Sequence, residues 1–230
     1  MPTDITELRS KLNTDSAKNQ LLIIQQLAEA GSPGWQELIN FLVESQVHPP
    51  GAIAGKAYQL LAQIVAPEVV EALQSHFPRG LVPLNSTVGI DYSPLQDLLV
   101  QLKFQAADKL TLEKLCELAG PKAVERGWLY FSEVKQFPPV DLQTLDTLWR
   151  VYSEGKFGYS VQRKLWLSLD KNWEKLWSKI NWRKPSGWTR YPQEFTWDLS
   201  APPGHLPLSN QLRGVRVIEA LLQHPAWTLD

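Results

Sequence analysis

Apolar side chains recur every three or four residues along most of the chain, which is the spacing of one face of an α-helix. In the first third of the chain this pattern predicts four helices, divided by turn residues, over 16–30, 35–45, 53–65 and 67–73. Antiparallel helices with short connections are typical of a four- or five-helix bundle or of a HEAT-like pair. No polar constellation stands out here, so we expect a scaffold or a docking unit.

The same spacing resumes after residues 80–91, which are rich in Gly, Pro, Asn and Ser and are typical of a linker. It predicts further helices over 92–102, 104–119, 141–152, 160–169, 172–180 and 208–222. No run of alternating β-branched residues is long enough to predict a sheet. The expected fold class is therefore all-α. We expect an N-terminal helical bundle over 1–82 and a C-terminal helical core domain over 83–230 that carries a long irregular loop.

Two segments do not follow the helical pattern. Residues 128–139 are rich in aromatic side chains, and residues 183–210 hold five prolines with Trp188, Tyr191, Phe195 and Trp197 between them. A connection of this length without regular structure is uncommon inside a domain and is usually functional. We therefore expect a binding loop, with Trp188 and Tyr191 as the residues that contact a ligand.

Tryptophan is unusually abundant, since the chain holds ten and nine of them lie beyond residue 127. Between 156 and 190, nine Lys or Arg residues are interleaved with five Trp, against only two acidic residues. One interpretation is that Trp166, Trp173 and Trp177 are core residues of short helices with basic outer faces. The alternatives are a cleft for a flat aromatic ligand with acidic groups, or a module that binds single-stranded nucleic acid by stacking.

Two arginines in the last predicted helix favour an acidic ligand. Arg213 and Arg216 are three residues apart, so a continuous helix would place them on one face. Each guanidinium offers a planar fork of donors that suits a carboxylate or a phosphate. Taken alone, the pair could equally be a solvated surface feature.

The rest of the composition excludes several functions. With a net charge of −1 the chain as a whole is no polycation built for duplex nucleic acid. A single cysteine, Cys116, excludes an internal disulfide and a thiolate zinc site, and its apolar neighbours predict a buried core residue. The four histidines lack metal-ligand spacing, and no apolar stretch approaches the about 20 residues that span a bilayer. We see no catalytic motif, so we expect a non-enzyme from a reducing compartment.

Five strings in the last half of the chain point to a known family. They are KLCELAG (114–120), WLYFSEVKQFP (128–138), FGYSVQRKLWL (157–167), EFTWDLSAPPGHLPLSNQLRGVRV (194–217) and HPAW (224–227). Over about residues 85–228 they resemble the genomes-uncoupled-four family, porphyrin-binding regulators of magnesium chelatase in chlorophyll biosynthesis. The preceding helical segment is similar to the N-terminal extension of cyanobacterial members.

The resemblance implies an all-helical protein that binds protoporphyrin IX or magnesium-protoporphyrin IX as ligand, without a catalytic cofactor or a resident metal. It implies stimulation of magnesium chelatase through the large porphyrin-binding subunit of that enzyme. It assigns eight residues to the porphyrin site: the apolar wall Phe131, Val134 and Phe137, the loop residues Trp188 and Tyr191, the propionate partners Arg213 and Arg216, and Asn210 near the central metal.

Further expectations concern partners and location. We expect a monomer that binds no nucleic acid and lies in the cytoplasm, partly associated with thylakoid or plasma membranes. Tyr191 stands where close relatives carry Trp, which preserves stacking but adds a hydroxyl group. The chain ends at Asp230, so we expect no regulation through the phosphorylated C-terminal extension of plant members.

Overall fold

The computed structural model, which describes residues 5–12, 14–209 and 214–228, confirms the all-α class. The chain divides into two units, Met1–Pro83 and Leu84–Asp230. The described part of the first unit holds five helices: α1 (Ile5–Leu12), α2 (Ala17–Glu29), α3 (Ser32–Ser45), α4 (Ala52–Leu61) and α5 (Pro67–His76). Their apolar faces enclose a core that includes Ile24, Leu27, Leu38 and Leu42.

Two features of the first unit differ from the prediction. Helix α1 was not expected, although Ile5, Leu8 and Leu12 have helical spacing and pack against the core. Helix α3 begins at Ser32 rather than Trp35, because Pro33 occupies the first turn, where its missing N–H costs nothing. Trp35 is then a packing residue whose indole Nε1 donates to the Ala28 carbonyl oxygen at 2.9 Å.

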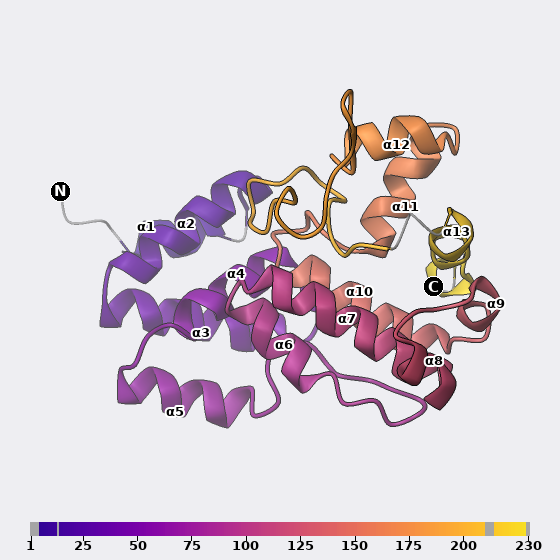
Figure 1. Cartoon of the computed structure of the whole chain (residues 1–230). Coiled ribbons are helices and arrows are strands. Elements are labelled where there is room, and N and C mark those ends of the chain that lie inside the picture. Colours follow the sequence, from indigo (N-terminus) through magenta and orange to yellow (C-terminus); the bar gives the residue numbers. More distant parts are fainter. Residues whose placement is uncertain (1–4, 13, 210–213, 229–230) are drawn as a thin grey trace. The chain divides into compact units, whose positions relative to one another are not determined.

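The first helices of the second unit are α6 (Ser93–Val100) and a long α7 (Phe104–Ala119). There follow α8 (Pro121–Arg126), α9 (Phe131–Val134), α10 (Pro139–Val151), α11 (Tyr159–Ser168), α12 (Trp173–Lys179), α13 (Arg216–Leu222) and the short 3-10 helix η2 (Pro225–Trp227). Figure 1 shows α7 and α10 running side by side, with α11 and α12 following them along the chain.

Three predictions for the second unit need correction. Residues 128–139 are not wholly irregular, because Glu133 accepts the Tyr130 backbone N–H at 2.7 Å and caps the single turn α9. The expected absence of strands is wrong in detail, since β1 (Arg183–Lys184) and β2 (Gly187–Trp188) form a minimal antiparallel hairpin. The last helix begins at Arg216 instead of Leu208, after Gly214 at a φ of 84°.

Helix α10 is the centre of the second unit. Its Trp149 is fully buried, stacks on Phe104 of α7 at 6.0 Å between ring centroids, and donates its Nε1–H to Thr111 Oγ1 at 3.0 Å. Phe157, just beyond α10, meets Phe104 edge to face at 5.4 Å. These aromatic contacts fix α7 against α10, and α7 forms one wall of the cavity described below.

Two buried carboxylates on α10 hold the adjacent chain segments. Asp141 accepts hydrogen bonds from the Thr87 backbone N–H at 3.1 Å, from the Thr87 hydroxyl at 3.0 Å and from the Tyr92 hydroxyl at 2.9 Å. Asp146 accepts both the backbone N–H and the hydroxyl of Ser160 at 2.7 Å. Gly158 lies so close to Asp146 that a Cβ there would meet its Oδ1 at 2.7 Å.

Replacing Asp141 by Ala should destabilise the second unit. The Tyr92 hydroxyl would lose its partner in a buried site, so we expect a loss of about 2–4 kcal/mol in the free energy of unfolding. Urea unfolding followed by Trp fluorescence reports this unit, because nine of the ten Trp lie in it. Asp97→Ala, on an exposed position of α6, is the control, and a loss no larger than that of the control would contradict the role of Asp141.

Candidate functional site

A ladder of indole rings supports the hairpin. Trp166 stacks on Trp173 at 4.7 Å, Trp173 on Trp177 at 5.1 Å, and Trp177 on Trp182 at 5.3 Å with an interplanar angle of 5°. Trp188 on β2 leans against Trp177 at 6.0 Å. Trp166 and Trp177 are buried, which confirms their interpretation as core residues, whereas Trp173, expected with them, is half-buried. Trp182 is buried as well.

The segment from 189 to 209 has no regular secondary structure, and buried side chains supply several of its hydrogen-bond partners. Gln162 on α11 donates from Nε2 to the carbonyl oxygens of Gly204 at 3.0 Å and Pro207 at 2.8 Å. Trp182 donates its Nε1–H to the His205 carbonyl oxygen at 2.7 Å. Position 204 favours glycine, because its φ is 80° and a Cβ there would meet Leu165 Cδ1 at 2.8 Å.

His205 is a neutral anchor inside this segment. Its Nδ1 lies 2.6 Å from the Ile180 carbonyl oxygen, so Nδ1 carries the proton, and its Nε2 accepts the Thr196 backbone N–H at 3.2 Å. Burial lowers the pKa of His205 below its usual value. The imidazole therefore joins the segment to the end of α12 and packs against Phe195, with ring centroids 5.4 Å apart.

This segment and α7 enclose a cavity of about 830 Å³, which lies in the size range of small-molecule sites. We call it the main cavity. Its apolar lining is Leu112, Trp188, Tyr191, Phe195 and Leu208, and its polar lining is Asp108, Lys109, Ser186, Thr189, Arg190, Glu194 and Ser209. Trp188 is 37% exposed and Tyr191 55% exposed, so both rings are available to a ligand. The lining can therefore contact a flat apolar ligand and still offer cations at its edge.

Asp108 is the unusual member of the lining. Its side chain is buried, and its Oδ1 accepts the Leu208 backbone N–H at 2.6 Å. No salt bridge to it occurs among the residues that the structure describes. Burial raises the pKa of Asp108 to about 7, because little in its surroundings stabilises the charged form.

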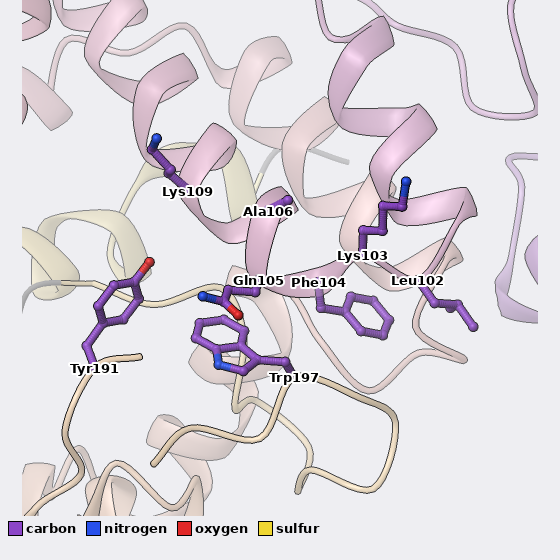
Figure 2. A pocket seen from close by; sticks show the side chains of 8 residues that line it. All are labelled: Leu102, Lys103, Phe104, Gln105, Ala106, Lys109, Tyr191 and Trp197. Atoms are coloured by element: carbon purple, nitrogen blue, oxygen red, sulfur yellow. The ribbon is translucent and has the colours of Figure 1, made fainter. Parts of the chain in front are cut away.

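A second, shallower cavity of about 430 Å³ adjoins the main cavity. Figure 2 shows Tyr191 and Trp197 of the irregular segment facing the start of α7, where Gln105 and Lys109 lie and which Lys103 precedes. The Tyr191 ring meets Trp197 edge to face at 5.9 Å. Tyr191 and Lys109 line both cavities, so they stand at the boundary between the two.

The residues expected from the sequence fall into two groups. Trp188 and Tyr191 line the main cavity, whereas Phe131 and Arg216 lie outside its lining and contact each other, with the Arg216 guanidinium carbon 5.6 Å from the Phe131 ring centre. Val134 and Phe137 are buried in the core beside them. Asn210 and Arg213 lie outside the described residues. Arg216 is the first residue of α13, and its expected shared helical face with Arg213 stays a prediction.

Sequence reasoning missed Asp108, Lys109 and Ser209 as lining residues, and it named Phe195 only as an aromatic residue of the expected binding loop. A signal for Asp108 was available, because it occupies a position of the buried stripe of α7 between Phe104 and Leu115. A charged residue on an apolar stripe is rare unless it is paired or functional.

Within the described ranges, no group of three or more His, Cys, Asp or Glu could hold a metal ion. No helix within those ranges is both long enough and apolar enough to cross a bilayer. Cys116 is buried, as predicted, and burial raises the pKa of its thiol.

Comparison with known families covers nearly the whole chain. The family described as GUN4-like matches residues 85–225, and the family described as "ARM-like repeat domain, GUN4-N terminal" matches residues 1–78. A "Ycf53-like protein" of Synechocystis sp. is 49% identical over 229 residues, which are 99% of this chain and 98% of that protein. The "Tetrapyrrole-binding protein, chloroplastic" of Arabidopsis thaliana is 41% identical over 145 residues, 59% of this chain and 55% of that protein.

Two solved structures resemble the second unit. GUN4 from Chlamydomonas reinhardtii has a TM-score of 0.61 and 44% identity, and it covers 64% of this chain and 95% of its own. The ligand-free structure of Arabidopsis thaliana GUN4 has a TM-score of 0.56 and 41% identity, with 62% and 98% covered. Both sequence and fold therefore place the second unit with these proteins.

The raised pKa of Asp108 predicts a pH-dependent effect of Asp108→Asn. Between its unfolded value near 3.8 and the folded value of about 7, the native state binds the extra proton, so the parent loses stability as pH rises through this window. Asn cannot ionise, so the variant does not lose this stability. Between pH 5 and pH 8, its free energy of unfolding relative to that of the parent should rise by on the order of 1–3 kcal/mol. Urea unfolding at both pH values measures the difference, with Asp97→Asn as the exposed control. A difference that does not change with pH would contradict the assignment.

Proposed function

Because the chain belongs to the GUN4-like family, we propose that its second unit binds a tetrapyrrole, specifically protoporphyrin IX and magnesium-protoporphyrin IX. The observation that carries this proposal is the main cavity, whose exposed rings Trp188 and Tyr191 lie opposite α7. The Arabidopsis relative named as a tetrapyrrole-binding protein supports the same ligand class.

The shape and chemistry of the ligand suit this lining. A porphyrin is a large flat apolar disc, and its affinity comes mainly from removing that surface from water. Trp188 and Tyr191 offer faces for stacking, and Leu112, Leu208 and Phe195 offer apolar surface. The Trp ladder beneath Trp188 holds this ring in place before a ligand arrives, which lowers the entropic cost of binding.

Cations around the site would meet the two propionates of the ring. We propose Arg213 and Arg216 as their partners and Asn210 as a contact near the central metal, as the family resemblance implies. Phe131, Val134 and Phe137 are proposed as the apolar wall, with the half-buried Phe131 ring as its accessible part. Lys109 and Arg190 in the main cavity add positive charge at its edge.

Single-stranded nucleic acid is the rival ligand class, and the burial of the Trp residues disfavours it. Trp166, Trp177 and Trp182, which would have to stack on bases, are enclosed by the fold. Nucleic-acid binding would weaken steeply with added salt, whereas porphyrin binding led by apolar burial would change little. The described residues show no placed catalytic group, so we propose a carrier or regulator rather than an enzyme.

We further propose that the loaded protein acts on the large porphyrin-binding subunit of magnesium chelatase in chlorophyll biosynthesis, as a monomer and in part at membranes. This proposal rests on family membership. Adding the protein to reconstituted chelatase should raise turnover at limiting porphyrin. Chelatase turnover that does not respond to the added protein would contradict it.

Removing the two exposed rings should weaken porphyrin binding. For Trp188→Ala combined with Tyr191→Ala we expect a loss of about 0.5–1.5 kcal/mol for each stacked ring in addition to the lost apolar area. Titration with protoporphyrin IX, read by the Soret shift and by Trp quenching, measures the affinity. Leu22→Ala, an exposed residue of the first unit, is the control. If the unchanged protein gives neither signal, the proposed function is wrong.

The propionate role of the arginines can be tested separately. Arg213→Ala with Arg216→Ala should cost about 1.5–3 kcal/mol for each charged hydrogen bond lost. Titration with the porphyrin dimethyl ester, which lacks the carboxylates, should show no such loss. Lys122→Ala on α8 is the matched control for removal of a surface cation. Equal losses with the acid and the ester would assign the arginines another role.

A further inference from the structure

The wall of the main cavity contains two buried polar groups that the proposed stacking does not use. Asp108 is 7% exposed, and the structure gives it one hydrogen bond, at Oδ1 from the Leu208 backbone N–H. The Ser209 hydroxyl oxygen is buried and has no hydrogen-bond partner among the described residues. Both residues line the cavity, and the bond to Leu208 ties Asp108 to the residue that precedes Ser209.

These two groups are costly unless a ligand completes their hydrogen bonding. A buried carboxyl without a cation and a buried hydroxyl without a partner each lower stability. Both have lone pairs to offer and both line the same cavity, so a ligand group that donates two hydrogen bonds would complement them. The surrounding aromatic and aliphatic lining indicates that this donor belongs to an otherwise apolar ligand.

A magnesium tetrapyrrole carries such a donor, and the metal-free ring does not. The N–H groups of the free ring lie in its plane and point at its own centre. Magnesium prefers oxygen ligands and gives up water reluctantly, so it keeps a water above the ring. Coordination makes this water a stronger donor, with two O–H bonds that point away from the face.

Resting on the proposed function, we infer that Asp108 and Ser209 accept the two O–H bonds of the magnesium-bound water, and that this pair makes the cavity prefer the magnesium tetrapyrrole over the free ring. Asp108 is a specificity-determining residue in this arrangement, and it does not bind the metal itself. The other charged lining residues, Lys109, Arg190 and Glu194, are exposed. They act on the propionates or on the overall charge, which the two ligands share, and so they do not discriminate between them.

The test is the ratio of the two dissociation constants in Asp108→Asn. The titrations are made at pH 8, where Asp108 with its pKa of about 7 is ionised. Asn keeps the size of Asp and an oxygen for the Leu208 N–H, but it replaces this charge-assisted acceptor by a neutral one. We expect affinity for magnesium-protoporphyrin IX to fall about five- to twentyfold, with affinity for protoporphyrin IX changing less than about twofold. Glu194→Gln removes the same charge from an exposed part of the lining and should shift both affinities by the same factor.

A second variant keeps the inference testable if Asp108→Asn folds poorly, which near-ultraviolet circular dichroism would reveal. Ser209→Ala should lower affinity for the magnesium ligand about two- to fivefold and leave the free ring unaffected. Equal losses for both ligands, or no loss, in a folded variant would overturn the inference while the proposed function stands. If the unchanged protein binds neither ligand, the proposed function fails first, so the two failures are distinguishable.

Discussion

The cavity depends on one constraint: about twenty residues without regular secondary structure must be held in place with their backbone groups satisfied. In a helix the backbone groups bind one another, but here local turns satisfy only some of them and other elements supply further partners. Gln162 binds two carbonyl oxygens, Trp182 binds a third, and His205 joins the segment to Ile180 and Thr196. Gln162 lies on α11 and Trp182 follows α12, whereas His205 belongs to the segment itself and reaches the end of α12. The irregular wall is thus attached to these two helices at several points.

The abundance of tryptophan follows from the same constraint. The segment has little apolar volume of its own, and short helices such as α12 bury little surface. Large rigid rings compensate, because each indole buries much area while losing few rotamers on folding. Trp177 contacts Trp173, Trp182 and Trp188, so one buried ring connects a helix, the chain that leaves it and the hairpin that lines the cavity. Most of the indoles therefore build the frame, and Trp188 is the one of these rings that lines the main cavity.

The sequence predicted the helical class and most helices, because apolar spacing is a local signal. It also indicated Trp188 and Tyr191, since aromatic residues in a proline-rich segment are unusual for a core. It did not predict that α13 starts at Arg216, because the helical spacing of apolar residues extends back to Leu208. The Leu208 backbone N–H is instead bound by Asp108, which lies a hundred residues earlier in the chain. Phe131 and Trp188 were expected in one site from matching strings. Whether two segments of the chain line the same cavity depends on long-range packing, which the spacing of residues within each segment does not encode.

The three buried aspartates of this unit differ in how many hydrogen bonds their carboxylates accept. Asp141 and Asp146 each accept two or more hydrogen bonds and hold neighbouring segments. Burial raises the pKa of Asp146 as well, but Asp146 also pairs with Arg150 at 3.0 Å. Asp108 accepts a single backbone bond beside a cavity, and its pKa of about 7 reflects how little compensates its charge. A fold that only needed stability would place an apolar residue or an amide there. The difference in hydrogen bonding, rather than burial as such, marks Asp108 as the member of the trio that faces a ligand.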